Sequence, residues 1–201
     1  MNEGSPTRSR LIALAEERRA MQEGYVFLDE KCLLLAGEML RELQRHDALA
    51  QTFAAAQRTA ADALRAALAR HGLEGLSVYP PARAGSLALT LSASALMGIP
   101  LHRAELAATP GSAPPAVFPS PEAEACRTAF VALAQAATAL APVVGNLARL
   151  LREYRRTVRR ASSLHDIVLP ELEAEVAAIA GQLEELERDE ALWIRGARRG
   201  S

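Results

Sequence analysis

The fold is decided by a stretch near the N-terminus, residues 11–40, which reads LIALAEERRAMQEGYVFLDEKCLLLAGEML. Its apolar residues recur at alternating spacings of three and four, the heptad pattern of a helix that packs along a second helix. The same pattern occurs near the other end of the chain, in residues 172–193, which read LEAEVAAIAGQLEELERDEALW. The predicted seam positions are Leu11, Leu14, Arg18, Met21, Tyr25, Leu28, Cys32, Leu35 and Met39 on the first helix, and Leu172, Val176, Ile179, Leu183, Leu186, Glu190 and Trp193 on the second.

These two seams lie at opposite ends of one chain, so the sequence predicts a mainly all-α protein built on a long antiparallel two-helix coiled coil. We expect residues 1–72 to form the N-terminal long helix and residues 121–201 the C-terminal one. Residues 73–120 should form a Pro-rich connector with a short β-hairpin at the turn. Start signals at Ser5-Pro6 and Ser120-Pro121, and a stop signal at His71-Gly72, mark the helix ends.

The connector holds most of the prolines, since seven of the eleven lie within it and Pro121 follows directly. Within it, Leu87, Leu89 and Leu91 alternate with small residues, which is the period-two pattern of a strand. Residues 97–101 are the predicted partner strand, at an edge because of Pro100. Residues 107–119 are predicted to be an irregular loop. Farther along, Pro142 and Pro170 are expected to kink or break the second helix.

The composition narrows the class of protein. The formal net charge of −1 gives no general signal for nucleic acid or membrane binding, and aromatic residues make up only 4% of the chain. No apolar run is expected to reach the ~20 residues that span a bilayer, and the N-terminus has no signal-peptide stretch. We therefore expect a cytoplasmic protein with no direct membrane insertion.

No catalytic or cofactor-binding motif is present. The four histidines (His46, His71, His102 and His165) have no metal-ligand spacing, and the pattern favours surface or interface roles for them. Cys32 falls on the seam, far from Cys126, so a disulfide between them is not expected. We predict no enzyme activity, no cofactor and no bound metal.

One charged segment stands out, because residues 149–160 carry six arginines against a single Glu153. Like charges at this density repel one another and weaken a helix unless an acidic surface faces them. Contact with an acidic partner is the favoured interpretation, a solvated helix face is the alternative, and nucleic-acid binding is the least favoured. The candidate contact residues are Arg149, Arg152, Arg156, Arg159 and Arg160.

The seam also suggests a register. Pairing Leu11 with Trp193 at the free end places Tyr25 opposite Ile179. The same register brings the two charged seam residues, Arg18 and Glu190, into adjacent layers, and we predict that they pair across the seam.

Three blocks of this sequence resemble the D subunit of the V-type and A-type rotary ATPases. The first is PTRSRL at residues 6–11 with LDEK at residues 28–31. The second is LMGIP at residues 96–100. The third is RRASSL at 159–164, VLPEL at 168–172 and LERDE at 186–190. The family usually has Asn-Ala-Leu-Glu where this chain has SSLH at residues 162–165, which indicates a divergent member.

The resemblance implies a non-catalytic central rotor shaft that transmits torque between an ATP-hydrolysing or ATP-synthesising hexamer and a membrane ion-translocating ring. It implies contacts with the catalytic and non-catalytic ring subunits A and B, with the small central-stalk F subunit and with the funnel-like C/d subunit. The complex would place the chain peripherally on the cytoplasmic face of the membrane. A static coiled-coil adaptor or scaffold is the alternative, and the sequence leaves open whether H⁺ or Na⁺ is transported.

Overall fold

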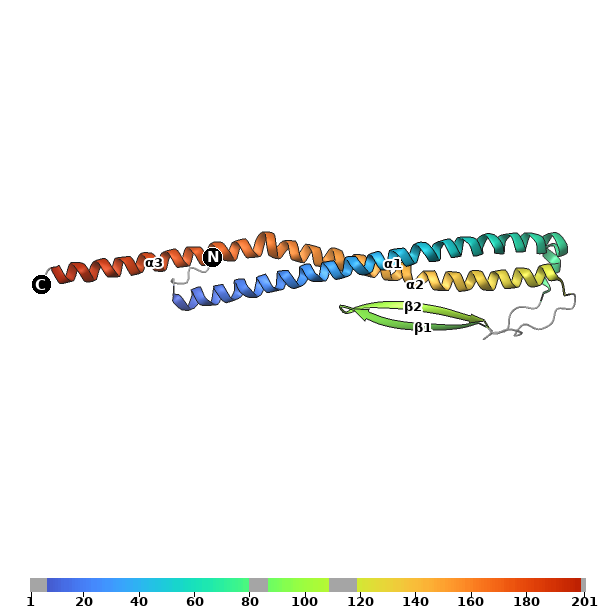
Figure 1. Cartoon of the computed structure of the whole chain (residues 1–201), viewed down its shortest axis with the longest axis horizontal. Coiled ribbons are helices and arrows are strands. Elements are labelled where there is room, and N and C mark those ends of the chain that lie inside the picture. The colour runs from blue at the N-terminus through green and yellow to red at the C-terminus, as the bar shows by residue number, and fades with distance from the viewer. Residues whose placement is uncertain (1–6, 80–86, 109–118, 200–201) are drawn as a thin grey trace. The chain divides into compact units, whose positions relative to one another are not determined.

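The computed structural model describes residues 7–79, 87–108 and 119–199. The elements are α1 (Arg8–Ser77), β1 (Leu87–Leu96), β2 (Ile99–Ala108), α2 (Pro121–Ser163), the single π-helical turn η1 (Leu164–Val168) and α3 (Leu169–Arg199) (Figure 1). The prediction of a mainly helical protein with one small antiparallel hairpin is confirmed. The chain forms two compact units, residues 1–34 with 154–201 and residues 35–153.

The helix ends follow local chemistry. The Thr7 hydroxyl accepts a hydrogen bond from the Arg10 amide at 3.3 Å and so caps α1, whereas the predicted cap at Ser5-Pro6 lies outside the described residues. Ser120 caps α2 as predicted, since its hydroxyl accepts from the Ala123 amide at 3.1 Å. At Gly72 the backbone leaves the helical region, with φ 69° and ψ 173°, and only a short helical segment follows to Ser77.

The two prolines in the second half of the chain act differently. Pro142 lies inside α2, which continues through it. Pro170 follows the π-helical turn, where the Leu169 amide bonds to the Leu164 carbonyl. A proline removes one backbone donor and crowds the carbonyl four residues earlier, and a widened turn just before it relieves that crowding. The wider turn lets one helix pass into the next without a break.

In the unit formed by residues 1–34 and 154–201, the predicted register is wrong. The Tyr25 ring packs against His165, with ring centroids 5.1 Å apart, and not against Ile179. The shift from 179 to 165 is two heptads, so the same heptad positions of each helix form the seam in both registers. Arg10 pairs with Glu175 at 2.7 Å and Arg8 with Glu187 at 2.5 Å, near the same register. A regular seam does not distinguish two alignments that differ by whole heptads.

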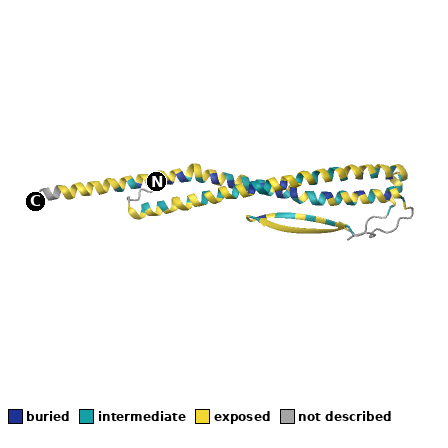
Figure 2. Cartoon of the chain, viewed as in Figure 1, coloured by how far each residue is buried: buried dark blue, intermediate teal, exposed yellow. Residues whose placement is uncertain are grey.

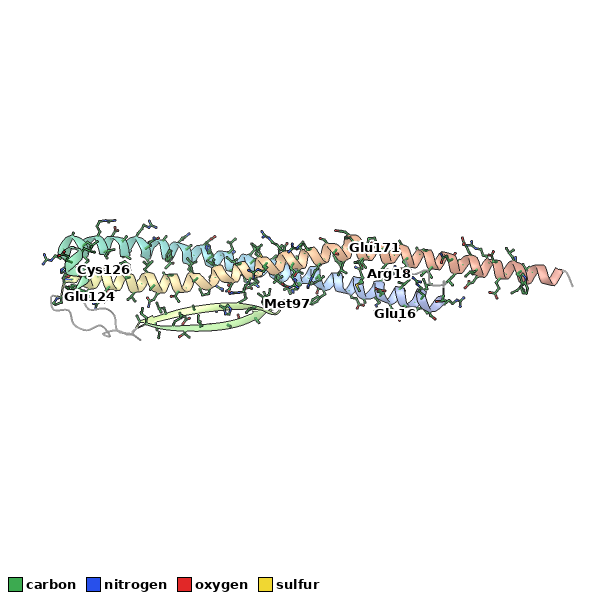
Figure 3. All side chains as sticks on the ribbon, turned by 180° about the vertical axis from the view of Figure 1, so that it is seen from behind. Glu16, Arg18, Met97, Glu124, Cys126 and Glu171 are labelled. Atoms are coloured by element: carbon green, nitrogen blue, oxygen red, sulfur yellow. The ribbon has the colours of Figure 1, made fainter. Side chains whose placement is uncertain are left out.

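Because the register differs from the predicted one, the burial of the C-terminal seam residues also differs. Leu172 and Ile179 are buried, but α3 continues past the N-terminal end of α1 (Figure 1). Trp193 is therefore 75% exposed and Leu186 is exposed as well. Arg18 and Glu190 are also exposed, and they do not pair (Figure 3 labels Arg18). The predictions that Arg18 pairs with Glu190 and that Leu11 contacts Trp193 are therefore wrong.

In the unit formed by residues 35–153, α1 and α2 enclose a narrow core, and β1 and β2 form a two-stranded antiparallel sheet. Met97 and Gly98 make the turn between Leu96 and Ile99, at the tip of the hairpin (Figure 3). Both have positive φ, 49° and 82°, as in a type I′ turn. The expectation that Met97 and Gly98 belong to the second strand is thus wrong. That strand runs to Ala108, past the predicted start of the loop.

The buried apolar side chains in this unit are small or aliphatic and include Leu35, Ala60, Ala67, Val143 and Leu150. This agrees with the helix-rich, Ala-rich composition. One 18-residue window within Pro121–Arg195 reaches a mean hydropathy of 1.6 and passes the length and composition test for a membrane-spanning helix. The prediction that no apolar run is long enough to span a bilayer is therefore wrong, since residues 128–148 carry no charge. Alanine is the most frequent residue of that stretch, and the segment's Gln135 and Asn146 bond to the hairpin.

Candidate interaction surfaces

A buried polar site joins three elements in the unit of residues 35–153. Asn146 on α2 is 2% exposed, and its side-chain amide bonds to the backbone of His102 on β2. The amide oxygen accepts from the His102 N–H at 2.8 Å, and the amide nitrogen donates to the His102 carbonyl at 3.0 Å. This is the donor–acceptor pair that a neighbouring strand would present. Asn146 therefore closes the outer edge of β2 in place of a third strand.

The remaining hydrogen-bonding capacity of Asn146 is also used. Its nitrogen donates to the Glu42 carboxylate on α1 at 3.2 Å, and its oxygen accepts from the Arg149 guanidinium at 2.7 Å. Arg149 also donates to the Pro100 carbonyl at 3.0 Å. Glu42 is 1% exposed and forms an ion pair with Arg45. We call Glu42, Asn146, Arg149 and the His102 backbone the polar clasp.

Sequence reasoning missed this site, although signals for it exist. Glu42 follows Leu35 and Met39 at heptad spacing, so it is the next seam position of α1. Asn146 lies in the uncharged stretch of residues 128–148, where a lone amide on a packed helix face needs partners. The identity of those partners depends on the hairpin folding back beside α2, which no local pattern specifies.

The predicted arginine cluster divides into two parts. Arg149 is half-buried in the polar clasp and is not free to meet a partner. Arg155, Arg156, Arg159 and Arg160 are exposed on one side of α2, whereas Thr157 on the opposite side is buried. Within the described part of the chain, no ion pair includes any of these four arginines. We call them the arginine face. Arg152 is exposed as well, and it belongs to the other compact unit.

A second surface lies on the outer side of α1. In the unit that contains residues 1–34, Val26, Phe27, Leu33 and Leu34 are 46% to 69% exposed, although neighbouring positions on the same helix pack in the seam. Val26 and Leu33 are seven residues apart, and so are Phe27 and Leu34. The four side chains therefore form a short apolar stripe along the helix, away from the seam. A soluble coiled coil ordinarily carries charge there. The exposed apolar stripe is therefore a candidate interaction surface.

The histidines and cysteines have structural settings. His71 bonds to the Ser120 hydroxyl at 2.5 Å and packs edge-on against Tyr79, while His165 lies beside Tyr25 and Asp166. Both cysteine thiols are free. Partial burial raises the pKa of the Cys32 thiol, and the neighbouring Asp29 carboxylate adds to the rise. Among the residues that the structure describes, no group of three or more His, Cys, Asp or Glu side chains could hold a metal ion.

These features define a class: a helical coiled-coil protein with a β-hairpin that the polar clasp holds against α2. The sequence profile of the family described as the D subunit of ATP synthase matches residues 10–195. The chain therefore belongs to the ATP synthase D-subunit family, as the three sequence blocks suggested.

Named relatives match along nearly the whole chain. The D subunit of a V-type ATP synthase from Thermotoga neapolitana is 24% identical over 192 residues, which cover 95% of each chain. The D subunit of a V-type ATP synthase from Anaeromyxobacter dehalogenans strain 2CP-C is 33% identical over 207 residues, which cover 97% of this chain and 95% of the relative.

Proposed function

We propose that this chain is the central-stalk rotor subunit of a V/A-type rotary ATPase and transmits torque between the ATP-hydrolysing or ATP-synthesising hexamer and the membrane ion-translocating ring. The observation that carries the proposal is the near full-length match to the D-subunit family, on a chain whose paired helices present charged residues outside the seam. The chain's part is mechanical, and the chemistry belongs to other subunits.

The partners in this proposal are the ring subunits A and B, the small central-stalk F subunit and the funnel-like C/d subunit, with the complex on the cytoplasmic face of the membrane. The apolar stripe of α1 supports a partner along the side of the coiled coil, because four large apolar side chains are exposed there. The arginine face supports a second contact with an acidic surface, since its charges repel one another without one.

Co-purification tests the complex. From cell extract, a tagged full-length chain should bring down ATPase ring subunits together with a small central-stalk partner. Recovery of the chain without any of these ATPase components would contradict the proposal.

A cleavable cross-link tests rotation. A photoreactive, thiol-cleavable label on Glu190→Cys, in the exposed part of α3, should attach the chain to the surrounding ring on illumination. If the chain rotates, cross-linking nearly abolishes ATP hydrolysis and reduction restores it. The labelled complex kept in the dark is the control. Full hydrolysis in the cross-linked complex would favour the alternative, a static coiled-coil adaptor or scaffold.

The arginine face is tested separately. Replacing Arg155, Arg156, Arg159 and Arg160 with Gln should weaken assembly at moderate salt and leave the helical content of the isolated chain unchanged, because Gln forms helices as readily as Arg. The matched control replaces Arg19, Arg41, Arg58 and Arg65, which are exposed on α1. Equal assembly of both variants would leave the arginine face as a solvated surface.

A further inference from the structure

The two edges of the hairpin differ, and the difference starts with β2. Side chains of α2 bond to its outer edge at three residues: Gln135 donates to the Leu106 carbonyl at 3.2 Å, Asn146 bonds to both backbone groups of His102, and Arg149 donates to the Pro100 carbonyl. All three β2 residues are even-numbered. The even-numbered residues of β2 therefore direct their backbone groups away from β1.

The register then assigns the backbone groups of β1. Opposite residues in an antiparallel pair either bond to each other or both face outward. Residues 100, 102, 104, 106 and 108 face outward, so their partners do too. Those partners are Ala95, Ala93, Leu91, Leu89 and Leu87. Five residues of β1 thus present N–H and C=O groups along its outer edge, to which no other strand is paired in the described part of the chain.

Nothing in β1 protects that edge. Natural sheets shield exposed edges with charged residues, prolines, bulges or a covering element. The sequence of β1, LALTLSASAL, has no charge and no proline, and its register with β2 is regular through ten pairs. Nine of its ten residues are exposed, and Leu91 is 69% exposed (Figure 2 shows the exposed strand). By contrast, β2 carries Pro100, Arg103 and Glu105 in addition to its cover by α2.

We propose that the free edge of β1 receives an extended strand from another protein of the complex, which adds to the hairpin as a third strand. The geometry selects this occupant, because backbone donors and acceptors at two-residue spacing match another extended backbone. The side chains select its chemistry. Leu87, Leu89 and Leu91 lie on one face and Ala88, Thr90 and Ser92 on the other, so the incoming strand is uncharged and alternates apolar with small residues.

The proposal rests on the proposed rotor function in one respect, because that function determines which kind of subunit can supply the strand. A strand bonded at up to five residues cannot detach and re-form at each rotational step without a large loss of hydrogen bonds. The partner that supplies the strand therefore turns with this chain and is not part of the surrounding stationary ring.

Residue-resolved hydrogen exchange of the full-length chain, isolated and within the purified complex, tests the proposal. In the isolated chain, the outward amides of Leu89, Leu91 and Ala93 should exchange quickly, and the inward amides of Thr90 and Ser92 slowly. In the complex, the outward amides should slow by at least tenfold. Unchanged outward amides in a complex that contains ATPase subunits would overturn the third strand and leave the rotor function standing. If ATPase subunits do not co-purify, the rotor function fails.

A pair of variants distinguishes the addition of a hydrogen-bonded strand from a partner that shields the edge without bonding to its backbone. Ala93→Pro removes one outward donor and leaves the inward bonds intact, as Pro100 already does on β2. Ala93→Val keeps the donor. Co-expressed with equal amounts of wild-type chain, Ala93→Pro should be under-represented about tenfold in the purified complex, and Ala93→Val should equal the wild type. Equal incorporation of Ala93→Pro, or equal loss of both variants, would overturn the proposal. Slow inward amides of Thr90 and Ser92 in the variant confirm that its hairpin is folded. Protection of the isolated chain that grows with its concentration would instead assign the edge to a second copy.

Discussion

The two compact units align their helices by different means. In the unit of residues 1–34 and 154–201, the buried residues are mostly apolar, with Thr157 as the buried polar one, and the cross-helix ion pairs are exposed or half-exposed. In the unit of residues 35–153, a buried carboxylate and a buried amide bond across α1, α2 and β2. An apolar seam tolerates a slip by whole heptads, whereas a buried polar network loses its partners at any slip. The comparison indicates that a heptad pattern specifies pairing, and buried polar groups specify alignment.

The largest expected effect is the formation or complete absence of a cross-link that reports the register of the apolar seam. With Cys32 and Cys126 replaced by Ser, the double variant Tyr25→Cys and His165→Cys should be joined within one chain by a short bismaleimide. The pair Tyr25→Cys and Ile179→Cys should not be joined, because two heptads of helix, about 21 Å, separate residues 165 and 179. Gel mobility and peptide mapping detect the link. Cross-linking of only the second pair would restore the register predicted from the sequence.

The next largest effect is expected in the polar clasp. Asn146→Ala leaves the Glu42 carboxylate short of one partner and the His102 N–H and carbonyl without theirs, so the free energy of unfolding should fall by about 3 kcal/mol. Denaturant unfolding measures this change, and faster exchange of the His102 amide reports release of the hairpin.

Gln135→Ala is the control for the clasp. Its side chain makes one exposed hydrogen bond to the same edge of β2, and its removal should cost less than about 1 kcal/mol. If both variants lose the same free energy, burial of the clasp contributes nothing.

A smaller effect should come from the ion pairs of the apolar seam. Glu175→Gln removes the charge that faces Arg10, and the loss of stability should stay below about 1 kcal/mol because both side chains are a third or more exposed. The loss should shrink further in strong salt, which screens exposed charges. A loss as large as that of Asn146→Ala would mean that exposed charges, and not only buried ones, set the alignment of this unit.

The smallest effect concerns Cys32 on the seam. Burial and Asp29 raise the pKa of its thiol, so at neutral pH it holds less thiolate than an ordinary cysteine and should be alkylated more slowly. The rate should keep rising as the pH passes the ordinary thiol range. Asp29→Asn should speed alkylation at neutral pH and Lys31→Gln should slow it, each by less than about threefold. Iodoacetamide labelling followed by mass spectrometry measures the rates, and shifts of the opposite sign would reject the assigned causes.

Local sequence patterns predicted the features that depend on neighbouring residues in the chain. The heptad spacing from Leu11 onward predicted the paired helices, the alternation from Leu87 to Leu91 predicted the first strand, and Ser120-Pro121 predicted a helix start. The three sequence blocks indicated the D-subunit family. Each of these signals lies within a few residues, and over such a range the spacing of apolar residues distinguishes a helix from an extended strand.

Only the tertiary structure decided the register, the strand boundary at Met97-Gly98 and the polar clasp. The two candidate registers use the same heptad positions of each helix, so their difference in free energy comes from particular contacts such as Tyr25 with His165. The clasp joins residues 104 positions apart in the chain, and Asn146 finds Glu42 and His102 only after the hairpin lies along α2. Local periodicity carries no information about such distant partners, and for this reason the alignment of the helices and the anchoring of the hairpin had to come from the structure.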